Sequence, residues 1–172
     1  MAGNLEFIKS ASGTSVSSLS VTDCFSAKYD VYKIVLTEFD VATAGADGVL
    51  RFLDSGGSVI SASEYDYAYL DMPAHTSFSD NNATGQTAIY TFTKDSRNDY
   101  ETGGFILYVY NPYDSSSYTF TQHQDTFFNN GNGGQGHKGI GVHKSAEQIT
   151  GINMLCSAGN IDNIKLSVYG VK

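Results

Sequence analysis

The closing stretch IDNIKLSVYG (161–170) alternates apolar side chains with polar or aromatic ones. The side chains of Ile164, Leu166 and Val168 fall on one side of an extended chain, and those between them fall on the other. A period of two residues is typical of a β-strand with one face on a core and the other in water, as in antiparallel sheets. This stretch therefore predicts a half-buried strand and points to an antiparallel β-fold.

Similar patterns recur along the chain. TAIYTFT (87–93) and SSYTFT (116–121) also alternate, which again predicts half-buried strands. Segments that are apolar on both sides are expected to be central strands, namely YKIVLTEF (32–39), GVLRFLD (48–54) and GFILYVYN (104–111). Further strands are expected at EFIKSA (6–11), SVTDCF (20–25), SVISAS (58–63), YDYAYLDM (65–72) and GINMLC (151–156).

Turn-forming segments separate these runs. They are AGADG (44–48), DSGG (54–57), SDNNATG (79–85), RNDYETGG (97–104), NPYDSS (111–116) and CSAGN (156–160). Their Gly, Asn and Asp residues accept positive φ or bond their own backbone. Turns at this regular spacing predict an all-β protein, here a single jelly-roll-like antiparallel β-sandwich. The best candidate for a short helix is KSAEQI (144–149).

The domain organisation follows from the same patterns. We expect one β-sandwich domain over residues 21–172. Residues 1–20 are expected to be an N-terminal arm or an edge segment, because SASGTSVSSLS (10–20) is rich in serine. An edge strand is the preferred interpretation of that serine-rich piece.

Composition and charge exclude several classes of partner. The 172 residues carry a formal net charge of −8 and no cluster of Lys or Arg, so we expect no nucleic-acid binding. No apolar run approaches the length of a membrane span, and the first residues lack the apolar region of a signal peptide. Folding is therefore expected in a cytoplasm, with Cys24 and Cys156 as buried free thiols. A disulfide between them is the alternative.

The glycine-rich stretch NNGNGGQGHKGIGVH (129–143) resembles a phosphate-binding loop only superficially. In GNGGQGHK the P-loop lysine is replaced by His137, and Gly139 follows Lys138 where a Ser or Thr should hold magnesium. We expect no nucleotide here and interpret the stretch as an exposed loop. The residues expected to contact a partner at its tip are Asn129, Asn130, Asn132, Gln135, His137 and Lys138.

Metal and catalytic sites are not predicted. His123, Asp125, His137 and His143 lack the tight pairing of zinc ligands. Oxygen ligands for calcium cluster at 80–82 and again at Asp95, Asn98, Asp99 and Glu101, but without EF-hand spacing, so turns are the preferred interpretation. No G-x-S-x-G elbow occurs. The acids considered for a glycosidase pair are Glu64, Asp66, Asp71 and Asp99, which a strand with a polar face explains better. We expect no catalytic residue, cofactor or metal.

Tyrosine is unusually frequent, with 12 residues. Its apolar ring and polar hydroxyl suit protein interfaces and sugar sites, so Tyr67, Tyr110 and Tyr113 are candidate contact residues. An ordinary strand former on a wet sheet face explains them equally well. Composition does not decide between these interpretations.

Two long stretches resemble a family of tailed-bacteriophage virion proteins found in phages of marine and cyanobacterial hosts. They cover residues 24–68 and 148–172, about 70 of the 172 residues. The matching elements are Tyr29-Asp30-Val31-Tyr32-Lys33-Ile34-Val35, Arg51-Phe52-Leu53-Asp54, Tyr65-Asp66-Tyr67-Ala68, Gly159-Asn160-Ile161, Ile164-Lys165-Leu166 and Tyr169-Gly170-Val171-Lys172. The closing strand resembles the family's IKLYGVK-like ending, with Ser167 and Val168 inserted. Because side chains alternate with a period of two, an insertion of two residues leaves the later side chains on the same faces of the strand. The insertion therefore lengthens the strand without changing which side chains face inward.

The resemblance implies a jelly-roll-like β-sandwich on the virion, assembled in the host bacterial cytoplasm. Because no stalk precedes the sandwich, we expect a non-enzymatic decoration or cement subunit of the capsid. Its partners would be the major capsid protein or other virion proteins, and copies of itself, including as a trimer at symmetry axes. The alternative is a tail-associated or fibre-head adsorption protein that binds host surface glycans. A polysaccharide depolymerase is the third hypothesis.

Overall fold

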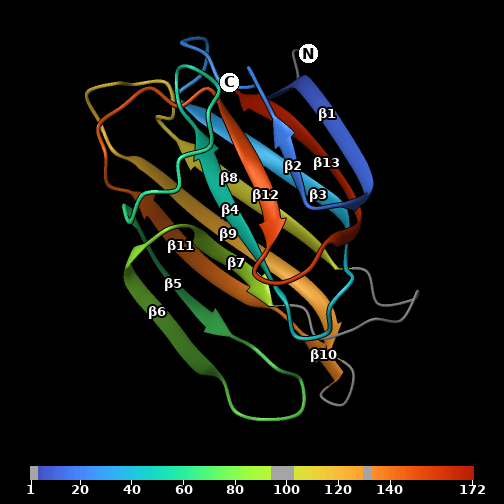
Figure 1. The fold of residues 1–172 in the computed structure, drawn as a ribbon. Coiled ribbons are helices and arrows are strands. Elements are labelled where there is room, and N and C mark those ends of the chain that lie inside the picture. Colours follow the sequence, from blue (N-terminus) through green and yellow to red (C-terminus); the bar gives the residue numbers. More distant parts are fainter. Residues whose placement is uncertain (1–3, 94–102, 130–132) are drawn as a thin grey trace.

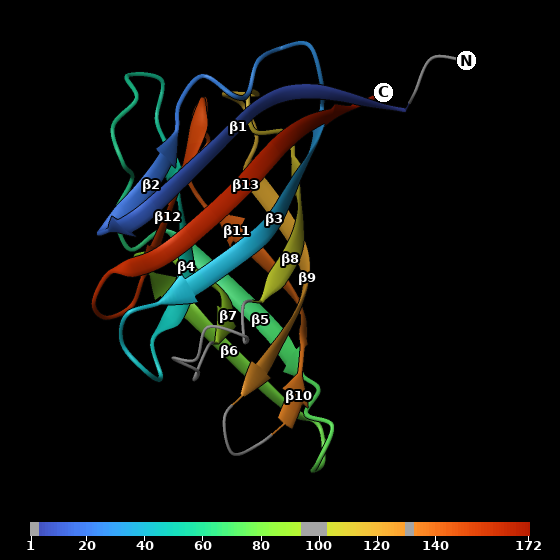
Figure 2. The same cartoon turned by 90° about the vertical axis from the view of Figure 1, so that its right-hand side faces the viewer.

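The computed structural model describes residues 4–93, 103–129 and 133–172. These residues form two antiparallel sheets packed face to face, which confirms the predicted all-β sandwich (Figures 1 and 2). The described part of the chain contains no helix, and so none that is long and apolar enough to cross a membrane.

The small sheet has the strand order β2 (Ser18–Val21), β12 (Gly151–Cys156), β4 (Asp47–Leu53) and β7 (Ile89–Thr93). The large sheet has the order β1 (Leu5–Val16), β13 (Ile161–Val171), β3 (Val31–Val41), β8 (Gly104–Tyr110), β9 (Thr119–Asn129), β11 (His137–His143), β5 (Tyr65–Asp71) and β6 (Ser79–Gln86). The short strand β10 (Gly133–Gln135) pairs with β9.

The path of the chain is that of a jelly roll. It passes from one sheet to the other at each step from β1 to β5, from β6 to β7, from β7 to β8, from β11 to β12 and from β12 to β13. Two additions widen the large sheet: the hairpin β8–β9 lies between β3 and β11, and the pair β1–β13 lies beyond β3. Strands β1 and β13 come from opposite ends of the chain and run side by side (Figures 1 and 2).

The core lies between the sheets and is built by the predicted alternation. On β13, Ile164, Leu166 and Val168 are buried, as expected from the period of two. They belong to one hydrophobic cluster that also includes residues of β4 and β12. A chain of this size buries roughly 70 % of its unfolded surface, so such a core can stabilise it without cross-links.

Both cysteines are free and buried in this core, as predicted. Burial raises the pKa of Cys24 to about 12 and that of Cys156 to about 11, because the charged thiolate is poorly solvated there. The two thiols are therefore packing groups of low reactivity.

Several expected elements differ in the structure. SVISAS (58–63) is not a strand: only an isolated bridge joins Val59 to Leu53. SDNNATG (79–85) is not a turn but most of β6, an edge strand whose polar side chains suit solvent on both sides. β2 lies a few residues earlier than expected, because the chain turns at Asp23, where φ is 51°. Of the predicted turn at 97–104, residues 97–102 lie outside the described residues.

The predicted helix at 144–149 is also wrong. This segment is the crossing from β11 to β12. The N–H of Lys144 donates to the carbonyl of Glu64 at 2.8 Å, and the N–H of Ile149 donates to the carbonyl of Pro112 at 2.8 Å. Ile149 is fully buried. Tertiary hydrogen bonds and the burial of one side chain thus override the local helical preference.

Candidate functional site

Strands β9 and β11 bury mostly polar side chains and glycines, and each leaves a large apolar side chain exposed on its other side. On β9, Thr119 and Thr121 are buried, whereas Phe120 is 49 % exposed. On β11, His137 and His143 are buried, whereas Ile140 is 61 % exposed. This is the reverse of an ordinary sandwich strand, whose apolar face covers the core.

Glycines on β11 explain how the inner face is filled. A Cβ added at Gly139 would lie 2.4 Å from His123 Cε1, and one at Gly141 would lie 2.7 Å from Ile89 Cδ1. At positions 139 and 141 the inner face of β11 therefore has room only for glycine, because a histidine ring and a branched side chain of neighbouring strands occupy the space. The interpretation of 129–143 as an exposed loop is wrong for 133–135 and 137–143, which are strands. Residues 130–132 lie outside the described residues.

The packing of Gly139 gives a testable prediction. Gly139→Ala should lower the free energy of unfolding by about 1–3 kcal/mol, because overpacking displaces the His123 ring or the β11 backbone. Gly134→Ala is the matched control, since a Cβ there meets no atom of the described residues within 4 Å. Urea unfolding of the three proteins measures the difference. Equal stability of the two variants would contradict this account of the glycines.

A buried polar cluster holds the ends of β9, β11 and β5 together. The N–H of His137 donates to Asp125 Oδ1 at 2.6 Å, and His137 Nδ1 lies 3.0 Å from Asp125 Oδ2. On the other side of the ring, Nε2 lies 3.5 Å from Asp71 Oδ1. Burial raises the pKa of Asp125, and the bonds to His137 partly offset that rise. His137 is only 1 % exposed, which corrects its assignment to an exposed tip.

His123 is buried beside this cluster, but its ring nitrogens differ from those of His137 in their hydrogen bonding. Neither of its ring nitrogens has a hydrogen-bond partner among the described residues. Its pKa is lowered to about 4, mainly by burial and in addition by the nearby charge of His137. His123 is therefore neutral in the folded protein near neutral pH. His123, Asp125 and His137 are each less than 10 % exposed, and His123 and Asp125 also border a hollow of the large sheet.

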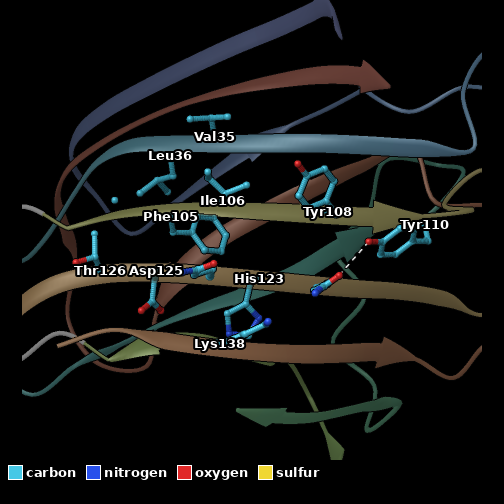
Figure 3. Close-up of a pocket in the computed structure, with 13 residues that line it drawn as sticks. Val35, Leu36, Phe105, Ile106, Tyr108, Tyr110, His123, Asp125, Thr126 and Lys138 are labelled. Atoms are coloured by element: carbon cyan, nitrogen blue, oxygen red, sulfur yellow. Dashed lines mark hydrogen bonds between the residues drawn. The ribbon is translucent and has the colours of Figure 1, made fainter. Parts of the chain in front are cut away.

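The outer face of the large sheet is hollowed. One hollow of about 570 Å³ lies over β3, β8, β9 and β11, and its lining includes Ile106, Tyr108 and Lys138 (Figure 3). A second hollow of about 560 Å³ lies over β9, β11, β5 and β6, and its lining is mostly apolar. Tyr110 and Gln122 line both hollows. The two hollows thus form one continuous surface, here named the outer face.

The outer face carries a set of exposed large apolar side chains. Its members are Leu70, Ile106, Phe120 and Ile140, with Val142 and Ala68 lining the second hollow between them. Its polar members include Gln122, whose Oε1 accepts a hydrogen bond from the Tyr110 hydroxyl at 3.2 Å. Large exposed apolar patches rimmed by polar residues are typical of interaction sites.

The structure brings only some of the predicted contact residues to this surface. Tyr110 and Lys138 line it. Tyr67 lines the second hollow but is half-buried, with its ring stacked on Tyr69 and Tyr90.

The other predicted contact residues lie elsewhere. Tyr113 is half-buried in the turn after β8. In β10, Gln135 Nε2 donates to Asp71 Oδ1 at 2.7 Å, so it is engaged within the chain. Asn129 ends β9, and Asn130 and Asn132 lie outside the described residues.

The oxygen-rich segment at 80–82 does not converge on a point. These residues lie in β6, where successive side chains point to opposite sides. The segment 95–101 lies outside the described residues.

A different group does converge: Glu64, His143 and Glu147 each present one ligand atom within 4.8 Å of the others. No local sequence pattern indicates this group of three ligands, because Glu64 is 79 residues from His143.

Comparisons with known proteins do not assign a family. No protein-family model matches the chain, and a search of curated proteins finds no match.

Proposed function

We propose that this protein is a non-enzymatic structural subunit of a tailed-phage virion that decorates or cements the head. It would attach through the outer face of the large sheet. The observation that carries the proposal is the facing of β9 and β11, which bury mostly polar side chains and glycines and leave Phe120 and Ile140 exposed. The resemblance at 24–68 and 148–172 supports the virion as the place of action.

The chemistry of the outer face favours a protein neighbour. Ile106, Ile140 and Val142 offer a partner apolar contact area but no hydrogen-bonding group. The cores of protein interfaces are depleted of charged residues and enriched in aromatic ones. Phe120, Tyr108 and Tyr110 supply the aromatic part here. Burial of these side chains at roughly 25 cal/mol per Å² of apolar surface would drive the attachment.

The two edges of the large sheet suit contacts between copies. Among the residues that the structure describes, β1 and β6 are the edge strands of this sheet, and each pairs with a neighbouring strand on one side only. An edge can pair with another chain, and closed rings such as trimers arise when such contacts are heterologous. Self-association through these edges is therefore part of the proposal, while the outer face binds the capsid of the phage head.

Host glycan binding is the second candidate function. Tyr108, Tyr110, Gln122 and Gln124 line the same hollow of about 570 Å³, where tyrosine rings and amides could hold a sugar. An adsorption protein at the tail or at a fibre tip would use this surface. Glycan binding ranks second because the aliphatic side chains beside these residues contribute less to the binding of a sugar than to the binding of a protein.

Co-sedimentation with phage heads tests the first function. Heads from a phage lacking this gene are mixed with the purified full-length chain and spun through a cushion. We expect saturable binding of hundreds of copies per head and greater resistance of the heads to heat or chelator. Binding to glycan arrays or to host cells, with none to heads, would overturn decoration in favour of adsorption. Release of reducing ends from host polysaccharide would show an enzyme instead.

A further inference from the structure

A histidine and two glutamates converge at the end of β11, away from the outer face. His143 Nε2 lies 3.3 Å from Glu64 Oε2 and 3.7 Å from Glu147 Oε1. Glu64 immediately precedes β5, His143 ends β11, and Glu147 lies in the crossing to β12. Three separate segments therefore supply one atom each to the same point.

We propose that Glu64, His143 and Glu147 bind a divalent transition-metal ion of the zinc class. Zinc bonds to imidazole nitrogen and carboxylate oxygen are about 2.0–2.2 Å long, which in a tetrahedron places neighbouring ligand atoms roughly 3.3–3.6 Å apart. The two nitrogen–oxygen distances at His143 are 3.3 and 3.7 Å, one within this range and one just above it. All three ligand atoms lie within 4.8 Å of one another, so small rotations of the glutamate side chains would be enough to bring them to bonding distance of one ion.

The imidazole is held in place before any ion arrives. His143 is 0 % exposed, and its backbone pairs with Tyr65 on β5 and with Thr119 on β9. The Tyr65 ring packs on it with centroids 4.9 Å apart, and the Phe52 ring lies 6.0 Å away. The Tyr65 hydroxyl is itself anchored, because it donates to the carbonyl of Ile60 at 3.1 Å. A rigid ligand loses little entropy on binding.

The charges around the group favour a cation. Glu64 and Glu147 are partly exposed carboxylates. The nearest basic residue in the sequence, Lys144, directs its Nζ to Asp66 at 2.8 Å rather than to this pair. Its backbone N–H meanwhile donates to the Glu64 carbonyl at 2.8 Å, which keeps Glu64 beside His143. Two carboxylates thus face one imidazole, and an ion would relieve their mutual repulsion.

The donor set selects the ion. An imidazole with carboxylates suits zinc and related transition metals, whereas calcium and magnesium prefer oxygen ligands alone. Three protein ligands leave a fourth position on the solvent side for water or for a group from a neighbouring subunit. The bound ion would tie the start of β5 to the crossing that enters the small sheet, and so would fasten the two sheets at one end.

Zinc titration of the tag-free full-length chain tests this site. After treatment with chelator, calorimetry should show one zinc ion per chain, and zinc should raise the melting temperature. Glu64→Gln and Glu147→Gln keep side-chain size. Because loss of outer-shell partners alone weakens metal binding by about 10–100-fold, loss of a direct ligand should cost at least about tenfold. Glu38→Gln on β3 removes the same charge elsewhere and should bind like wild type.

Defined outcomes overturn the proposal. They are no saturable binding up to millimolar zinc, unchanged affinity in both glutamine variants, or binding of calcium in place of zinc. X-ray absorption at the zinc edge of the loaded protein adds a readout of the ligands. One imidazole nitrogen with oxygen donors supports the site, and any sulfur or a second imidazole contradicts it. None of these readouts depends on attachment to heads, so failure here leaves the proposed function standing.

Discussion

Ile140→Asp should weaken attachment to phage heads by roughly 30-fold or more, because truncation of a central interface residue typically costs about 2 kcal/mol or more. Ile140 is 61 % exposed and lines the outer face between β9 and β5. The isolated subunit should stay folded, since the new carboxylate points to water. Within the complex the carboxylate would be buried without a partner.

Val59→Asp is the matched control for that variant. Val59 is 40 % exposed and lies in the loop after β4, bridged to Leu53, so it is outside the outer face. This variant should bind heads like wild type. The affinity of both is measured by co-sedimentation, and their folding by circular dichroism. Unchanged binding of Ile140→Asp, or an equal loss in both variants, would contradict attachment through the outer face.

Acid should destabilise the protein through His123. Its pKa is about 4 in the folded chain, against an ordinary value of 6.5. Between these values the unfolded chain binds a proton that the folded chain excludes, so stability falls as the pH falls through this window. From pH 7 to pH 4, His123 alone should remove about 3 kcal/mol of unfolding free energy.

His123→Leu isolates this contribution. Leucine fills the site without a titrating group, and neither His123 ring nitrogen has a partner to lose among the described residues. The stability of the variant relative to wild type should rise by about 3 kcal/mol from pH 7 to pH 4. Asp125, whose raised pKa acts in the opposite sense, is present in both proteins and cancels in the difference. Urea unfolding across the pH range measures it, and parallel curves would show that His123 does not cause the acid sensitivity.

The fold could be predicted where the period of two coincides with an apolar inner face. β13 is the clearest example, since Ile164, Leu166 and Val168 alternate and are all buried. Central strands such as β3 and β8 also followed from apolar runs. Failures occurred at β6 and at 144–149, where tertiary pairing rather than local preference decides the conformation.

The candidate site could not be predicted because periodicity does not say which side of a strand faces inward. In HKGIGVH (137–143) one side carries His and Gly, and the other carries Lys, Ile and Val. The usual rule that the apolar side of a strand faces the core would place Ile140 inside. In the structure the glycine and histidine side of β11 faces the core instead. Glycine was interpreted as loop flexibility, although here it provides space for Ile89 and His123. The metal-ligand group depends on long-range strand order, which no local pattern encodes.

Symmetry-resolved electron cryo-microscopy of intact particles tests the central claim most directly. The account predicts many copies over the head, with the outer face of the large sheet, including Phe120 and Ile140, buried against the shell. Copies confined to the tail or to fibre tips, with that face turned to solvent, would contradict it and would make Tyr108 and Tyr110 the receptor surface to study.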